Sequence, residues 1–75
     1  GEALNVVELN GKTCKVTLFT SKTQKGKVLV ECQAQFIELI AKVSDSSTKD
    51  EFKQGDKALI IEINNNTAYI IDADF

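Results

Sequence analysis

Apolar and polar residues alternate along most of this chain, and a period of two is typical of β-strands. The first two alternating stretches, residues 13–20 and 27–32, are rich in β-branched residues and flank a polar segment that ends at Gly26. The apolar faces of the two stretches consist of Cys14, Val16, Leu18, Val28, Val30 and Cys32. The pattern predicts an antiparallel hairpin whose turn uses the positive φ that Gly26 can adopt.

The register of this hairpin can be predicted from the side chains that it brings together. When Cys14 lies opposite Cys32, the apolar residues share one face, and Lys15 meets Glu31 on the other. The same register pairs Leu18 with Val28, Val16 with Val30, and Phe19 with Lys27. The cysteines are then cross-strand neighbours in the core, and we expect free thiols because disulfides between adjacent strands are often strained.

A third strand is predicted over residues 35–43, followed by a polar break over residues 44–56. The strand's inward residues are Ile37, Leu39, Ala41 and Val43, and its other face includes Phe36, Glu38, Ile40 and Lys42. In the break, Ser47 or Thr48 is expected to cap a single helical turn, with Phe52 turned toward the core.

Residues 57–63 and 67–73 predict the last two strands, joined by three asparagines, a residue type that tolerates the left-handed geometry of a tight turn. Both strands are apolar on two faces: Ala58, Ile60, Ala68 and Ile70 form one, and Leu59, Ile61, Ile63, Tyr69 and Ile71 form the other. Five strands with an excursion after the third predict an all-β fold, a small five-stranded OB-fold-like barrel over residues 11–73. An SH3-like barrel is the alternative, and residues 1–10 are expected to form an N-terminal arm or a linker.

Composition restricts the chemistry that the chain can perform. Its 75 residues include no His, Arg, Pro, Trp or Met, and the net charge is −2. Histidine is the commonest general base and the commonest nitrogen ligand of metals, and two cysteines cannot complete a zinc site. Asp50, Glu51 and Asp56 alternate with lysines and do not follow the spacing of a calcium loop. We therefore expect no enzymatic activity, no metal and no cofactor.

Lysines are concentrated between residues 11 and 27, where no acidic residue occurs. The candidate basic patch consists of Lys12, Lys15, Lys22, Lys25 and Lys27. It is either a solvated hairpin tip or a surface for anionic lipid headgroups or a protein partner. We do not expect nucleic acid to bind there, because that function needs stacking aromatic residues beside the lysines and few are present.

More apolar residues are present than one barrel interior needs. The candidate interaction surface on the outside consists of Phe19, Leu29, Phe36, Ile40 and Tyr69. Either this surface docks a partner, or the arm at residues 4–9 and the loop around Phe52 cover it.

Several short motifs resemble the soluble C-terminal domain of NfeD-family membrane proteins. They are LNGKTCKVTL at 9–18, KGKVLVE at 25–31, LIAKVS at 39–44, FKQGDKALII at 52–61 and NTAYII at 66–71. Two positions depart from the family pattern: Leu39 replaces a frequent aromatic residue, and Ala58 replaces a valine. The resemblance implies an OB-fold domain tethered to upstream transmembrane helices, and the N-terminal Gly1 fits a domain cut from such a protein.

The resemblance also implies a function. Proteins of this family are thought to work with stomatin- or flotillin-like scaffold proteins in membranes, and nothing here corresponds to the protease domain of longer members. We therefore expect a non-enzymatic interaction or scaffolding domain of a membrane-associated protein, facing the cytoplasm. The alternative is a stand-alone OB domain that binds single-stranded nucleic acid or an oligosaccharide.

Overall fold

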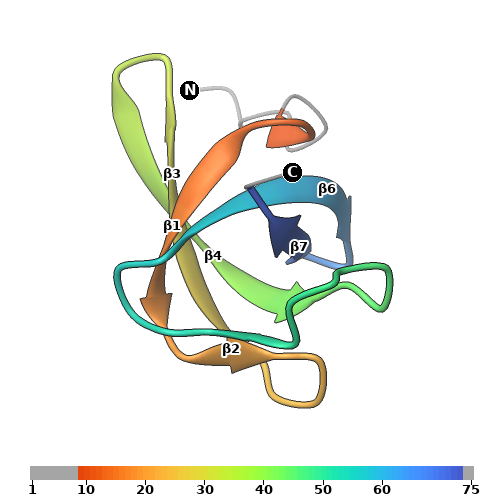
Figure 1. Cartoon of the computed structure of the whole chain (residues 1–75). Helices are drawn as coiled ribbons and strands as arrows, with labels where there is room; N and C mark the ends of the chain where they lie inside the picture. Colours follow the sequence, from red (N-terminus) through yellow and green to blue (C-terminus); the bar gives the residue numbers. More distant parts are fainter. Residues whose placement is uncertain (1–8, 74–75) are drawn as a thin grey trace.

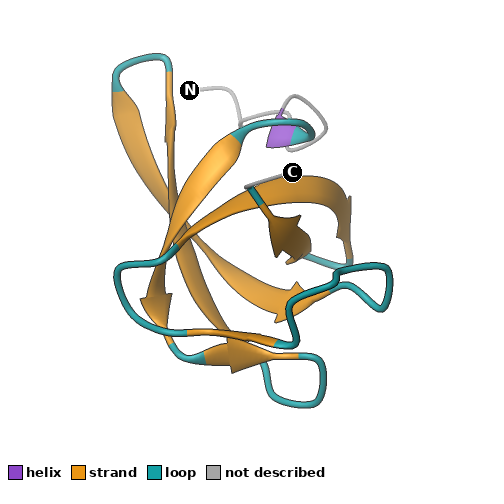
Figure 2. Ribbon diagram, viewed as in Figure 1, coloured by secondary structure: helices purple, strands orange, loops and turns teal. Residues whose placement is uncertain are grey.

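Seven strands follow one another in the computed structural model of the chain, which describes residues 9–73 (Figures 1 and 2). They are β1 (Thr13–Leu18), β2 (Thr20–Ser21), β3 (Gly26–Cys32), β4 (Gln35–Val43), β5 (Glu51–Phe52), β6 (Lys57–Asn64) and β7 (Thr67–Asp72). Five of these strands close a barrel in the order β1-β3-β4-β7-β6, and the short strands β2 and β5 pair separately. Neighbours in the barrel are antiparallel except for β4 and β7, which are parallel. The predicted all-β, five-stranded, OB-like barrel is confirmed.

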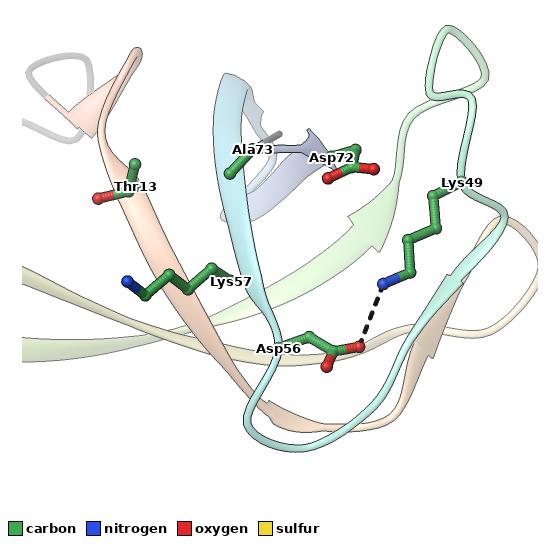
Figure 3. A pocket seen from close by; sticks show the side chains of 6 residues that line it. All are labelled: Thr13, Lys49, Asp56, Lys57, Asp72 and Ala73. Carbon is green, nitrogen blue, oxygen red and sulfur yellow. Dashed lines mark hydrogen bonds and ion pairs between the residues drawn. The ribbon is translucent and has the colours of Figure 1, made fainter. Parts of the chain in front are cut away.

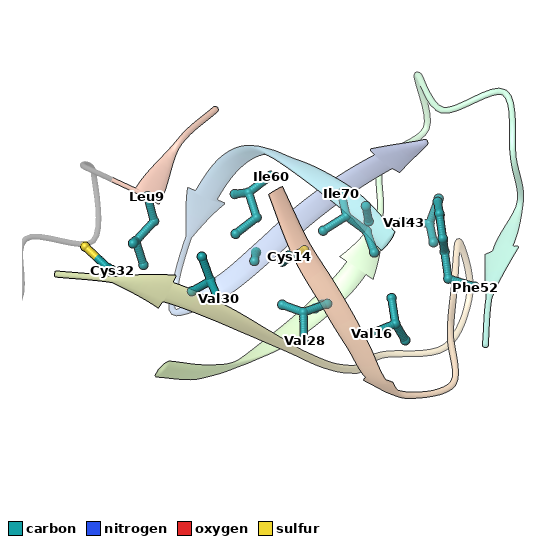
Figure 4. Close-up of a cluster of buried hydrophobic side chains, with 13 residues drawn as sticks. Leu9, Cys14, Val16, Val28, Val30, Cys32, Val43, Phe52, Ile60 and Ile70 are labelled. Atoms are coloured by element: carbon teal, nitrogen blue, oxygen red, sulfur yellow. The ribbon is translucent and has the colours of Figure 1, made fainter. Parts of the chain in front are cut away.

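The barrel interior is filled by apolar side chains from all five strands and from the segments that close its two ends (Figure 4). The buried residues are Leu9, Cys14, Val16, Val28, Val30, Cys32, Ala41, Val43, Phe52, Ala58, Ile60, Ala68 and Ile70. Figure 4 shows Leu9 and Phe52 at opposite ends of this cluster. The inward faces predicted for the strands are therefore largely correct, and so is the inward position of Phe52. The remainder of the predicted arm, residues 1–8, lies outside the described residues.

The register between β1 and β3 differs from the prediction by two residues. Val16 lies opposite Val28, and Lys15 lies opposite Leu29 rather than Glu31. A shift of two keeps every side chain on its face, so both cysteines are buried and free as predicted. They are not cross-strand neighbours, because Cys14 pairs with Ala58 on β6 and Cys32 pairs with Gln35 on β4.

Two β-bulges explain the residues that the alternation assigns to the wrong face. The register shifts between Val16 and Leu18, and Leu18 is 52% exposed instead of inward. A second shift between Ile60 and Glu62 turns Ile63 back against the core. A bulge adds one residue to one strand of a pair, so the period of two changes phase beyond it.

The connection between β1 and β3 is more than a hairpin turn. Gly26 is the first residue of β3, and a Cβ there would overlap the carbonyl oxygens of Leu18 and Phe19 and the Thr20 hydroxyl. Its role is therefore to allow close approach of two backbone segments rather than to supply the positive φ that we predicted.

The break between β4 and β6 contains a short strand where a helical turn was predicted. The Ser47 hydroxyl donates to the carbonyl oxygen of Lys49 at 2.8 Å and accepts from its N–H at 3.2 Å, so this polar side chain stabilises a bend. Glu51 and Phe52 then pair with Ser21 and Thr20 as the β2–β5 ladder.

Two hairpin turns contain residues in the left-handed backbone conformation. Asn65 and Asn66 have φ of 53° and 62° between β6 and β7, as the asparagines predict. Gln33 and Ala34 have φ of 55° and 64° between β3 and β4, although neither residue type favours that region.

Candidate functional site

The five residues of the candidate interaction surface all lie outside the core cluster, but they do not form one patch. Leu29 on β3 and Phe36 on β4 line the same hollow, and Phe36 is 69% exposed. Ile40 lies four residues farther along β4, opposite Lys27, and Tyr69 lines a different recess beside Lys42. Phe19 is half-buried in the link between β1 and β2.

Two exposed apolar residues were missing from that surface. Leu18 and Ile61 are 52% and 37% exposed, and each lies at one of the two bulges. Alternation assigns Leu18 to the core, and only the position of the bulge, which the sequence does not reveal, places it outside.

The candidate basic patch is distributed along the barrel and partly neutralised. The Nζ atom of Lys22 lies 3.1 Å from the Asp50 carboxylate, and that of Lys27 lies 3.9 Å from Glu38. Lys12 precedes β1, whereas Lys25 is exposed and immediately precedes β3. The five lysines therefore do not gather at one hairpin tip.

The hollow that contains Leu29 and Phe36 forms where β1 separates from β3. Its volume is about 360 Å³, and it is lined by Thr13, Cys14, Lys15, Leu29, Glu31, Phe36 and Lys57. Lys15 is the first residue of β1 that pairs with β3, and residues 13–15 pair with β6. We call this feature the β1–β3 hollow. Leu29 and Phe36 supply its apolar side chains.

Two lysines lie directly opposite each other at the border of the hollow. Lys15 on β1 pairs with Lys57 on β6, and residues in this relationship have Cβ atoms ~4.5–5.5 Å apart. Neither ammonium group makes an ion pair within residues 9–73. Figure 3 shows the Lys57 side chain pointing away from the Asp56 carboxylate, which instead contacts Lys49 at 3.4 Å. The hollow thus combines an apolar wall with two unneutralised positive charges and one carboxylate, that of Glu31.

A second recess of about 440 Å³ lies on the other side of Lys57, and four of its six lining residues carry a charge (Figure 3). It is lined by Thr13, Lys49, Asp56, Lys57, Asp72 and Ala73, and an ion pair within it joins Lys49 and Asp56 at 3.4 Å. The backbone N–H of Lys53 donates to Asp56 at 2.9 Å, and this hydrogen bond, with help from Lys49, lowers the pKa of Asp56. Within the described part of the chain, no group of three or more Asp, Glu, His or Cys side chains could hold a metal ion.

The thiol of Cys14 is buried and free. Burial raises the pKa of Cys14 to about 12, so the thiol is protonated at neutral pH and is a poor nucleophile.

No helix in residues 9–73 is long and apolar enough to cross a membrane.

Comparisons with known proteins come from solved structures, because no protein-family model and no curated protein sequence matches the chain. The soluble domain of the NfeD protein YuaF from Bacillus subtilis superimposes with a TM-score of 0.75 at 22% identity, covering 91% of this chain and 77% of that chain. The soluble domain of a membrane protein implicated in regulation of membrane protease activity, from Corynebacterium glutamicum, has a TM-score of 0.69 at 21% identity, covering 88% and 94%.

The third similar structure is the C-terminal domain of stomatin operon partner protein 1510-C from Pyrococcus horikoshii. Its TM-score is 0.64 at 14% identity, covering 87% of this chain and 88% of that chain. The resemblance indicated by the sequence motifs is thus confirmed in the fold: the chain is a five-stranded barrel with the architecture of the soluble domains of NfeD-type membrane proteins.

Proposed function

We propose that this chain is a non-enzymatic docking domain of a membrane-associated protein, and that it binds a stomatin- or flotillin-type partner on the cytoplasmic side of the membrane. The observation that carries the proposal is an excess of apolar side chains on the outside of the barrel. Phe36, Leu18 and Ile40 are each close to half exposed or more, although the barrel interior is already filled. Contiguous exposed apolar surface is typical of protein interaction sites, and Leu29 and Phe36 supply such surface in the β1–β3 hollow.

The similar structures support the membrane setting of this proposal. Two are soluble domains of membrane proteins, and the third comes from a stomatin operon partner. The side chains of the described residues support binding rather than catalysis, because the Cys14 thiol is protonated and the chain has no histidine.

Direct binding to a purified stomatin- or flotillin-type protein of the same organism tests this function. A variant with serine at Leu18, Phe36, Ile40 and Ile61 should bind at least tenfold more weakly, because it removes exposed apolar side chains without opening the core. A matched control with Gln24→Ala and Gln54→Ala changes exposed polar residues and should bind like the parent chain. Circular dichroism establishes that each variant is folded.

The same samples also test nucleic-acid binding. Binding of a labelled single-stranded oligonucleotide that weakens steeply as salt rises would overturn the docking proposal, because steep salt dependence is typical of phosphate contacts through lysines. Failure of the parent chain to bind either type of scaffold protein would also overturn it.

A further inference from the structure

We propose that the β1–β3 hollow binds an extended segment of the partner that carries an acidic side chain next to an apolar one. The apolar side chain packs on Leu29 and Phe36, and the carboxylate lies between Lys15 and Lys57. This inference rests on the proposed docking function and adds the location and the chemistry of the partner.

The apolar contact follows from the position of two side chains. Among residues 9–73, Phe36 is the most exposed large apolar residue, at 69%, and with Leu29 it lines the hollow. Aromatic side chains are enriched in protein interfaces and often supply a large share of the binding energy. A partner side chain in this hollow would bury apolar surface that the folded chain leaves in water.

The acidic contact follows from the Lys15–Lys57 pair. Like charges directly opposite each other destabilise a sheet, and no acid of residues 9–73 pairs with either lysine. A carboxylate placed between the two ammonium groups converts this repulsion into two favourable contacts. An unfavourable pair such as Lys15 and Lys57 is expected where a functional site requires both charges.

The register sets the spacing of the two contacts. Lys57, Lys15 and Leu29 lie in one row across three neighbouring strands, and adjacent strands are ~4.8 Å apart. A carboxylate midway between the lysines is thus ~7 Å from Leu29, which matches the distance between side chains two residues apart on one face of an extended chain. The segment therefore runs across the strands from β6 toward β3.

Glu31 determines the orientation of the bound segment. It lines the hollow on the β3 side, away from β6. A second acidic residue near Glu31 would be repelled, so the acidic end of the segment points toward β6. The same carboxylate disfavours a polyphosphate backbone in this hollow.

Three synthetic octapeptides test the inference. In the first, Asp alternates with Leu and Phe; the second has Lys in place of every Asp; the third has Ser in place of every Leu and Phe. In a nitrogen-15 NMR titration of the chain, the first peptide should shift the amide signals of Lys15, Leu29, Phe36 and Lys57 saturably. The other two should bind at least tenfold more weakly. Absence of saturable shifts at these residues with the first peptide would overturn the inference, and so would equal binding of all three peptides.

Matched variants separate the acidic contact from the apolar one. Lys15→Glu should weaken binding of the first peptide at least tenfold, while Lys25→Glu, the same charge change at an exposed lysine outside the hollow, should not. Phe36→Ser should also weaken binding tenfold, while Gln35→Ser, at the exposed neighbouring residue of β4 that does not line the hollow, should not. Equal effects of a variant and its control would contradict the assigned site.

The whole partner protein distinguishes this inference from the proposed function. If a stomatin- or flotillin-type protein binds the chain but Lys15→Glu and Phe36→Ser leave its affinity unchanged, the hollow is not the docking site and the proposed function stands. If the acidic peptide binds in the hollow but neither scaffold protein binds, the inferred site stands and the proposed function falls.

Discussion

Phe52 lies opposite Thr20 across the short β2–β5 ladder, and both side chains are completely buried. Figure 4 shows Phe52 beside Val16 and Val43 at one end of the core. The Thr20 hydroxyl donates to the carbonyl oxygen of Leu18 at 2.8 Å, so this buried polar group has a partner. The two short strands therefore close one end of the barrel.

Removing the Phe52 ring should destabilise the fold severely. Phe52→Ala leaves a cavity where Phe52 fills the end of the core, and such substitutions cost ~3–5 kcal/mol, a large fraction of a small domain's stability. Urea denaturation followed by circular dichroism measures the loss. Phe36→Ala is the matched control, because the 69% exposed Phe36 ring should change the free energy of unfolding little. Similar losses for both variants would contradict the assigned burial.

Substitutions in the turn at Gln33 and Ala34 should increase the stability of the fold. Both residues have positive φ, which costs side chains other than Gly, Asn and Asp conformational energy. Replacing the pair with Asn-Gly, the sequence that this kind of hairpin favours, should raise the free energy of unfolding by about 1 kcal/mol. The reciprocal change at Asn65 and Asn66, to Gln-Ala, should lower it. An unchanged urea midpoint in both variants would show that these turns carry no strain.

The thiol of Cys14 should be almost unreactive in the folded chain. Because burial raises its pKa to about 12, the thiolate fraction at pH 8 should be more than about 100-fold lower than that of an ordinary cysteine. Alkylation with iodoacetamide, followed by peptide mapping, should modify Cys14 quickly only after denaturation. Rapid modification of this residue under native conditions would mean that the thiol is accessible.

Asp56 should contribute to the loss of stability in acid. Its folded-state pKa lies below the ordinary value of an aspartate, chiefly because the Lys53 N–H donates to its carboxylate. A lowered pKa stabilises the folded state above the unfolded pKa, and this contribution disappears as the pH falls through the folded value. Asp56→Asn should therefore reduce the drop in the urea midpoint between about pH 6 and about pH 2. An identical acid profile in both proteins would show that the hydrogen bond does not favour the ionised form.

Local periodicity predicted which face most residues occupy, because side-chain alternation depends only on neighbours in the sequence. It placed Val16, Val28 and Ala41 in the core and Phe36 outside. The partners across strands were harder to predict. A shift of two residues preserves every face, and charge pairing between Lys15 and Glu31 favoured the wrong choice. Bulges are also invisible in the pattern, so Leu18 was assigned to the interior.

The β1–β3 hollow could be predicted only in part, because it depends on which strands pair with each other. Leu29, Phe36 and Lys15 were identified as candidates from short-range patterns, but Lys57 was not. Its place beside Lys15 depends on the pairing of β1 with β6, which joins residues 42 positions apart (57 − 15). No local signal in the sequence determines which strands meet when the barrel closes.

This pairing of β1 with β6 also sets the order in which the chain can acquire its structure. Thr13 meets Leu59, which follows it by 46 residues (59 − 13), so β1 can pair with β3 early but forms its second ladder only when β6 is present. Bringing two distant segments together costs loop-closure entropy before their contacts stabilise the fold. Barrels dominated by such pairings therefore fold in milliseconds to seconds rather than in microseconds. On the ribosome, β1, β3 and β4 emerge before β6, so an open sheet with an uncovered apolar face precedes the closed barrel. The newly synthesised chain is therefore most prone to aggregate before β6 and β7 are available.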